Sequence, residues 1–222
     1  LHLNPVLAWD TRFFDKVDLG RIQKNPIWNF NFLGLQFFLK AFLWPPDKCI
    51  LMADLIFASH NDNKSREIRQ LLPSYQISSL KDLGFTEEIP ETGNSLDANA
   101  AIKAERIFKE YQKPVFADDT GLIVPALDGA PGVYSARYAG PEADAQANMA
   151  KLLKELQGKE DRYAYFETVI CYIDAQGKKH FFSGKVEGRI LEQQQGEQGF
   201  GYDPIFCAEG ESLSFAEMSP AA

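Results

Sequence analysis

The sequence predicts an α/β fold, in which short apolar strands alternate with amphipathic helices before a long hairpin. The first observation is a buried-strand pattern at Leu55–Ala58, followed directly by residues that cap helices. The second is a run with helical spacing between Ser95 and Tyr111. The third is a pair of aromatic and β-branched segments joined by a turn at Asp174–Gly177. Strands that alternate with helices favour a sheet covered by helices.

The first two helices have clear start and stop signals. Asn61, Asp62 and Asn63 offer caps for a helix that runs to about Leu72, where Pro73 stops it. Ser95 caps a longer helix that runs to about Tyr111. The apolar residues of this second helix lie on one face: Leu96, Ala100, Ala104, Ile107, Phe108 and Tyr111.

Further along the chain, a strand, a helix and a hairpin are expected in that order. Pro114–Ala117 predicts a strand that ends at Asp118–Asp119, and apolar character resumes from Leu122 to Leu127. Glu142 to Leu156 predicts a third helix. The hairpin strands are expected at Tyr163–Ile173 and Lys178–Ile190.

Composition and charge narrow the class of protein. The chain has 222 residues, of which 45% are hydrophobic and 24% charged, as in globular proteins. A formal net charge of -8 argues against binding to a nucleic-acid backbone, which needs clustered Lys and Arg. Cys49, Cys171 and Cys207 are too few and too scattered for a disulfide framework or a zinc site. They are expected to be buried structural thiols in a reduced, cytoplasmic setting.

Residues 1–52 differ from the rest of the chain. They carry a net charge of +2, against -10 for the remainder, and contain the aromatic-rich run Ile27–Trp44. This run is about as long as a membrane-spanning helix, but it is interrupted by Asn29, Asn31, Gln36 and Lys40, and polar residues at the centre of a bilayer are costly. A membrane anchor and an interfacial or partner-binding segment remain open alternatives to an extension outside the main domain, such as one created by a start codon placed too early. Residues 53–222 are predicted to form the main domain.

The segment Ser59–Lys64 lies between a predicted strand and a helix N-terminus. Backbone N–H groups and the helix dipole favour an anion there, and Lys64 adds a positive charge suited to phosphate. The segment is not a Walker loop, because the glycine spacing is absent. An ordinary capped turn with a solvated lysine is the alternative.

The acidic residues form a second group of candidates. Asp118 and Asp119 follow an apolar strand, where α/β sheets place ligands, and adjacent residues of an extended chain point to opposite sides. Glu91, just before the long helix, is a candidate for a second metal ligand, since magnesium takes one or two carboxylates besides phosphate oxygens. Lys103 shares a helix face with Asn99 and is a candidate for phosphate binding. An Asp-rich turn is the simpler interpretation of the acidic pair.

The segment Gly199–Ile205 combines glycine, aromatic and acidic residues. Glycine allows the backbone to approach a ligand closely, and Phe200 is suited to stacking on a base. Asp203 is suited to accepting hydrogen bonds from a base or ribose. A β-turn that packs two aromatic rings is the alternative.

Taken in order, these segments resemble one family over residues 55–220. The family is the house-cleaning purine nucleoside triphosphate pyrophosphatases, known as inosine triphosphate or dITP/XTP pyrophosphatases. The resemblance rests on six motifs in register: Ser59-x-Asn-x-x-Lys64, Glu91-Thr-Gly, Asn99-Ala-x-x-Lys103, Ala117-Asp-Asp-Thr-Gly121, Gly129-Ala-Pro-Gly-Val-Tyr-Ser-Ala-Arg137-Tyr and Gly199-Phe-Gly-Tyr-Asp-Pro-Ile205.

The resemblance implies an elongated fold with a long mixed β-sheet flanked by helices, and two lobes with a cleft between them. It implies a homodimer that hydrolyses a purine nucleoside triphosphate to the monophosphate and pyrophosphate with Mg²⁺. Asp119 would be the catalytic residue and, with Glu91, a metal ligand. The remaining motif positions would bind substrate, at Ser59, His60, Asn61, Asp62, Asn63, Lys64, Lys103 and Thr120 for the triphosphate, and at Phe200, Gly201, Tyr202 and Asp203 for the nucleoside.

The sequence departs from the family pattern near Ala222. In the family, the segment that matches Ser214–Pro220 is followed by a helix with a lysine and a Ser-His-Arg motif that help to recognise the base and phosphates. The absence of that motif leads to the expectation that the domain is incomplete at its C-terminus and that base recognition is impaired. Three alternatives therefore stay open: a nucleotide-binding fragment without turnover, a membrane-tethered form, and a pyrophosphatase for modified pyrimidines.

Overall fold

The structure is a computed structural model that describes residues 54–73 and 75–218. The predicted extension at residues 1–52 and the aromatic run 27–44 lie outside the described residues, as do Cys49 and residues 219–222. Within the described part of the chain, no helix combines the length and apolar character that a membrane crossing requires.

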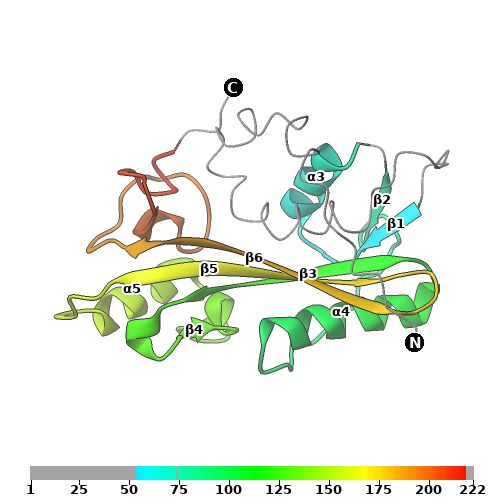
Figure 1. The fold of residues 1–222 in the computed structure, drawn as a ribbon, viewed down its shortest axis with the longest axis horizontal. Coiled ribbons are helices and arrows are strands. Elements are labelled where there is room, and N and C mark those ends of the chain that lie inside the picture. The colour runs from blue at the N-terminus through cyan, green and yellow to red at the C-terminus, as the bar shows by residue number, and fades with distance from the viewer. Residues whose placement is uncertain (1–53, 74, 219–222) are drawn as a thin grey trace, which may run out of the picture.

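Seven strands form one mixed sheet (Figure 1), as expected for an α/β fold with a long mixed sheet. The strands in sheet order are β2 (Gln76–Ser79), β1 (Asp54–Phe57), β3 (Val115–Ile123), β5 (Tyr163–Ile173), β6 (Lys179–Ile190) and β7 (Phe206–Ala208), with β4 (Pro131–Gly132) paired to the far end of β3. The pairs β1–β2 and β1–β3 are parallel, and the others are antiparallel. The predicted hairpin is confirmed as β5 and β6.

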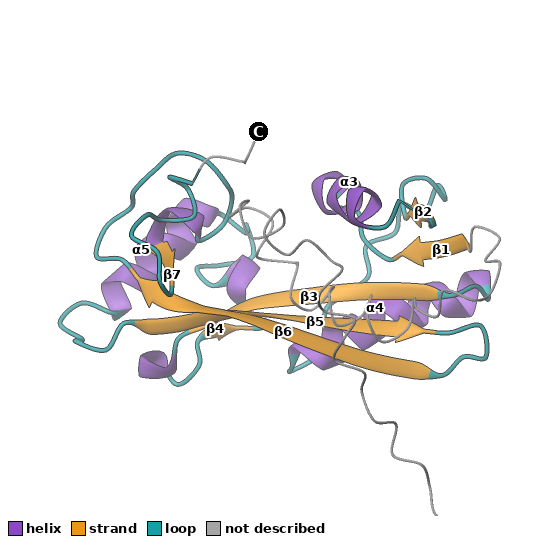
Figure 2. Ribbon diagram, turned by 45° about the horizontal axis from the view of Figure 1, so that its top comes forward, coloured by secondary structure: helices purple, strands orange, loops and turns teal. Residues whose placement is uncertain are grey.

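Helices cover both faces of this sheet (Figure 2). They are α3 (Asp62–Leu71), α4 (Leu96–Tyr111) and α5 (Ala145–Glu155), with short 3-10 helices η3 (Pro125–Leu127), η4 (Ser135–Arg137) and η5 (Asp203–Ile205). Helix α4 packs on one face of β1, β3 and β5, and α3 packs with β1 and β2 on the other. At the opposite end, α5 forms a separate core with the ends of β3 and β5 and with the segment after β6.

The separate cores make two lobes, which the long strands β3, β5 and β6 connect. Helix caps fix the first lobe as the sequence predicts. Ser95 Oγ accepts from the Ala98 backbone N–H at 3.2 Å, and Asn61 Oδ1 accepts from the Lys64 N–H at 3.2 Å. The first two helices, α3 and α4, begin and end within about a residue of their predicted bounds.

Two predicted bounds are wrong. Strand β3 does not end at Asp118–Asp119 but continues to Ile123, because antiparallel pairing with β5 extends without interruption to Ile123↔Tyr165. The third helix begins at Ala145 and not at Glu142. Its cap is Asp144, whose side chain accepts from the backbone N–H groups of residues 146 and 147, and Ala143 just before it has a positive φ of 52°.

Candidate functional site

A gap in strand pairing opens the cleft between the two lobes. Strand β1 pairs with β3 as far as Phe57↔Phe116, and β4 begins its pairing at Leu122↔Gly132. Neither strand pairs with the edge of β3 between these points, which holds Asp118, Asp119 and Thr120. Residues of both lobes line the cavity beside this stretch of β3.

The two adjacent aspartates lie on opposite faces of β3, as the alternation of a strand predicts. Asp118 pairs with Lys64 of α3, with 2.5 Å between Oδ2 and Nζ. Asp119 faces α4, where its Oδ1 lies 3.4 Å from Lys103 Nζ. The turn that the sequence suggested for this pair is absent, since both residues are in the strand.

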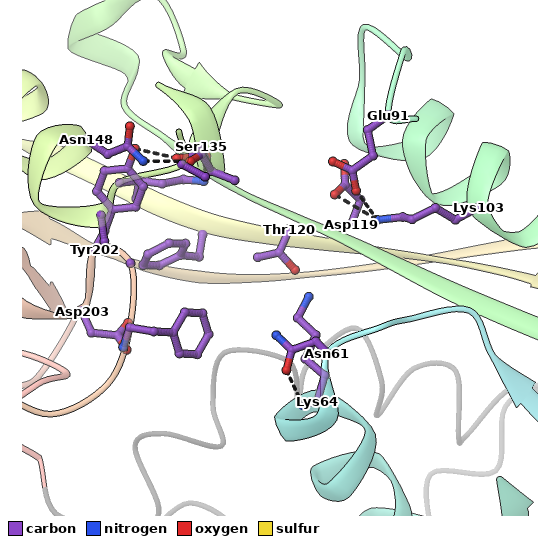
Figure 3. A pocket seen from close by; sticks show the side chains of 17 residues that line it. Asn61, Lys64, Glu91, Lys103, Asp119, Thr120, Ser135, Asn148, Tyr202 and Asp203 are labelled. Atoms are coloured by element: carbon purple, nitrogen blue, oxygen red, sulfur yellow. Dashed lines mark hydrogen bonds and ion pairs between the residues drawn. The ribbon is translucent and has the colours of Figure 1, made fainter. Parts of the chain in front are cut away.

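Glu91 completes the acidic group from the loop before α4. Lys103 Nζ donates to Glu91 Oε1 at 2.7 Å, so one lysine joins Glu91 and Asp119 (Figure 3). The loop is fixed to α4 by a hydrogen bond of 2.8 Å from the Gly93 N–H to Asn99 Oδ1. A Cβ at position 93 would approach that oxygen to 2.7 Å, which explains the glycine of the Glu91-Thr-Gly motif.

Burial and neighbouring charges shift the pKa values of Asp118 and Asp119 in opposite directions. Burial tends to raise the pKa of Asp118, but Lys64 and Lys103 outweigh it and the pKa is lowered. Burial raises the pKa of Asp119, and Lys103 offsets this only in part. The pKa of Lys103 is raised, because attraction to the three carboxylates exceeds the cost of burial. Lys103 therefore stays charged, and Asp119 is a stronger base than Asp118.

A cavity of about 490 Å³ extends from this acidic group to the second lobe. We call the group formed by Lys64, Lys103, Asp119 and Glu91, together with Asp118 from an adjoining hollow, the lysine end. The part formed by Phe166, Phe200, Tyr202, Asn148 and Asp203 is the aromatic end. Figure 3 shows the labelled residues of the two ends facing one another across the cavity, with Thr120 between them.

The aromatic end combines three rings with one buried acid. Phe200, at 60% exposure, is the most accessible of its rings. Asp203 is buried and accepts a hydrogen bond from the Phe200 backbone N–H at 2.8 Å. Burial raises the pKa of Asp203 to about 6. Gly199 has a positive φ of 82°, and a Cβ there would lie 2.2 Å from Asp203 Oδ2, so glycine is required beside this acid.

Most substrate-binding candidates from the sequence meet at the cavity. Asn61, Lys64, Lys103 and Thr120 line it, and so do all four candidates from Phe200 to Asp203. Ser59 and His60 line an adjoining hollow of about 550 Å³ that shares the lysine end.

Two candidates point elsewhere or are not described. Asp62 pairs on the surface with Lys81, at 2.6 Å between Oδ2 and Nζ, and lines neither hollow. The side chain of Asn63 lies outside what the structure describes.

Sequence reasoning did not assign roles to several residues that shape the site. Asn148 of α5 donates to the Ala136 carbonyl at 2.9 Å and accepts from the Ala139 N–H at 2.6 Å. Ser135 lines the cavity, and Arg137 lines the adjoining hollow. Ser135 and Arg137 lie in the motif at residues 129–138, which was a usable signal, whereas nothing in the local pattern marks Asn148.

Comparison with known proteins identifies relatives over the same region. The sequence profile of the Ham1 family matches residues 55–222. A dITP/XTP pyrophosphatase from Christiangramia forsetii is 52% identical over 165 residues, which cover 74% of this chain and 86% of that protein. A dITP/XTP pyrophosphatase from Porphyromonas gingivalis is 53% identical over 169 residues, covering 75% and 87%.

A solved structure supports the same relationship. The Staphylococcus aureus Ham1 protein superposes with a TM-score of 0.71 at 38% identity, over 75% of this chain and 86% of that chain. The similarity confirms the family resemblance and the elongated α/β fold with a long mixed sheet.

Proposed function

Because the chain belongs to the Ham1 family, we propose that it hydrolyses non-standard purine nucleoside triphosphates, such as ITP, dITP and XTP, to the monophosphate and pyrophosphate. The observation that carries the proposal is the division of one cavity into a lysine end suited to phosphates and an aromatic end suited to a base. The high identity to named pyrophosphatases favours this enzyme over a nucleotide-binding fragment without turnover.

The proposal includes a Mg²⁺ ion held by Glu91 and Asp119. The residues fit such an ion: Asp119 Oδ2 is buried without a hydrogen-bond partner among the described residues, and magnesium prefers carboxylate oxygens. Glu91 lies close enough to share Lys103 with Asp119. When bound, the ion would neutralise phosphate charge and lower the pKa of the attacking water.

The residues of this chain would divide the remaining work. Lys64, Lys103 and Thr120 hold the triphosphate, and Phe200 and Tyr202 hold the base. Asp119 aligns the water and accepts its proton, a role that the raised pKa of its carboxyl group supports. The water oxygen bonds to the α-phosphorus, the bond between the α- and β-phosphates breaks, and pyrophosphate leaves.

We also propose a homodimer and a cytoplasmic setting. The dimer follows from the family resemblance, and the mass in solution tests it against the 25.0 kDa of one chain. The cytoplasmic setting is supported by Cys171 and Cys207, which are buried unpaired thiols. Burial raises the pKa of Cys171 to about 12, as expected for an unreactive structural thiol.

Product analysis tests the proposed reaction. We expect monophosphate and pyrophosphate in equal amounts from ITP, dITP and XTP, slower turnover of ATP, GTP and modified pyrimidine triphosphates, and no turnover after removal of Mg²⁺ with EDTA. Chromatography of the nucleotide products with a pyrophosphate assay measures each outcome. Formation of diphosphate and orthophosphate, or binding of ITP without turnover, would exclude the proposed activity.

A further inference from the structure

Arg137 connects the two ends of the cleft. It ends η4, a short helix on the second lobe, yet its guanidinium reaches Glu91 at the lysine end. Nη2 donates to the Glu91 backbone carbonyl at 3.1 Å, and Nη1 lies 3.7 Å from Glu91 Oε2. Lys103 binds the other oxygen, Oε1, so two cations compensate the Glu91 carboxylate.

The backbone that carries Arg137 is held firmly in place. Ser135 Oγ accepts from the Leu122 N–H of β3 at 2.9 Å, and Tyr202 donates to the Ser135 carbonyl at 2.8 Å. Asn148 of α5 binds the groups on either side of Arg137. Any movement at this position is therefore expected in the long side chain and not in the backbone.

Among the three cations at this end, Arg137 is the least constrained. Lys64 lies 2.5 Å from its carboxylate, and Lys103 lies 2.7 Å from Glu91. Arg137 is 3.7 Å from the same carboxylate. Its side chain is 36% exposed, compared with 23% for Lys64 and 15% for Lys103. A loose, partly exposed ion pair is weak, so separating it costs little.

Arg137 also faces the hollow in which phosphates would lie. It lines the adjoining hollow of about 550 Å³ together with Asn61, Lys64 and Lys103. A guanidinium presents several N–H donors in a plane and suits phosphate oxygens. A divalent ion at Glu91 would compete with Arg137 for Oε2, whereas the hydrogen bond to the backbone carbonyl does not involve the carboxylate.

We propose that Arg137 is a further substrate-binding residue, which pairs with Glu91 in the free protein and turns to the phosphate chain when a metal ion takes the Glu91 carboxylate. This inference rests on the proposed function, because the metal and the triphosphate belong to it. It assigns to η4 a role in phosphate recognition, in addition to its packing role between the lobes.

Metal binding without nucleotide tests the first half of this proposal. Mn²⁺ is titrated without nucleotide into wild type, Arg137→Ala, Arg137→Lys and Arg189→Ala, and electron paramagnetic resonance measures its binding to each protein. Removal of the competing cation in Arg137→Ala should tighten Mn²⁺ binding by about two- to fivefold, the size of one partly exposed ion pair. Arg137→Lys keeps the charge and should bind as wild type does. Unchanged or weaker Mn²⁺ binding by Arg137→Ala would overturn the proposed competition.

Steady-state kinetics with ITP at saturating Mg²⁺ test the second half. Arg137→Ala should raise KM about tenfold with little change in kcat, as for loss of one charged hydrogen bond. Arg137→Lys keeps the positive charge, so its KM should stay close to that of wild type. Arg189→Ala removes the same charge from β6, outside both hollows, and should match wild type.

An unchanged KM in Arg137→Ala overturns the role in substrate binding. A wild type that releases no pyrophosphate overturns the proposed function instead, and the Mn²⁺ titration still tests the contact with Glu91. If Arg137→Ala does not fold, Arg137→Gln replaces it in both experiments.

Discussion

Asp118 and Asp203 lie at opposite ends of the cleft and differ in their chemistry although they are equally buried. Their exposures are 8% and 9%. Burial raises the pKa in both cases, but Lys64 and Lys103 reverse the effect at Asp118 and lower its pKa. Asp203 has a backbone N–H and no cation as a partner among the described residues, and its pKa is raised to about 6. Burial alone does not decide the charge of an acid, and its partners do.

This difference separates two binding tasks. At the lysine end, Lys64, Lys103 and the neighbouring Arg137 compensate three carboxylates, which suits a metal ion and a phosphate chain. The aromatic end offers rings and one acid without a cation, which suits a flat, uncharged base. The comparison predicts that loss of the acid Asp119 at the lysine end affects chemistry, whereas variants at the aromatic end affect binding and stability.

The largest expected effect is at Asp119. Asp119→Asn should lower kcat for pyrophosphate release from ITP by about a thousandfold, because the amide neither accepts a proton nor supplies a carboxylate to the metal. Binding of a non-hydrolysable ITP analogue, measured by calorimetry, should largely survive, since the lysines and the aromatic end are retained.

The matched control is Asp128→Asn, which removes an acid outside the main cavity. Asp128 has a positive φ of 54°, a conformation that asparagine adopts readily, so the change should leave the fold and the activity intact. Near-normal pyrophosphate release by Asp119→Asn would contradict the assignment of Asp119.

The sequence predicts the helices of this site better than the strand pairing and the contacts between distant segments. Helical spacing and the Ser95 cap define α4, and therefore the position of Lys103, from local signals. The continuation of β3 through Asp119 depends on pairing with β5, about 50 residues away, and the local Asp-Asp-Thr-Gly pattern indicates a turn instead. Long-range pairing overrides the local preference.

Contacts between segments were also beyond local reasoning. Arg137 meets Glu91 only because η4 is held between β3, α5 and Tyr202. Periodicity describes one element at a time and gives no signal for such a contact. The six motifs in register located most cavity residues, but they gave no indication that one lysine joins Glu91 and Asp119.

A smaller effect is expected from Asp203, on stability and not on chemistry. Its folded pKa of about 6 exceeds the ordinary value of 3.8, so the folded state favours the protonated form. Its contribution to stability is complete below pH of about 4 and is lost as the pH rises through about 6. The difference between these two pKa values corresponds to about 3 kcal/mol at most. Asp203→Asn should remove this loss, so that the free energies of unfolding of the two proteins diverge between these pH values.

Urea denaturation across that pH range measures the divergence. Salt provides the control, because a shift caused by burial is screened much less than a shift caused by surface charges. The divergence should therefore persist at high ionic strength. Parallel curves for wild type and Asp203→Asn would show that folding does not raise the pKa of Asp203, and the contrast with Asp118 would fail.

The smallest expected effect is at Phe200, and it tests whether the two ends act separately. Phe200→Ala should raise KM for ITP about tenfold, since stacking of one base on an aromatic ring contributes about 1–3 kcal/mol. Inhibition by inorganic tripolyphosphate should not change, because that molecule has no base and engages only the lysine end. Phe181→Ala removes another exposed ring, on β6 away from the cavity, and should leave both quantities as in wild type.

An equal loss of tripolyphosphate inhibition in Phe200→Ala would mean that the aromatic end also shapes the phosphate site. The cavity would then act as one unit, and the anchoring of η4 by Tyr202 would be the first connection to examine.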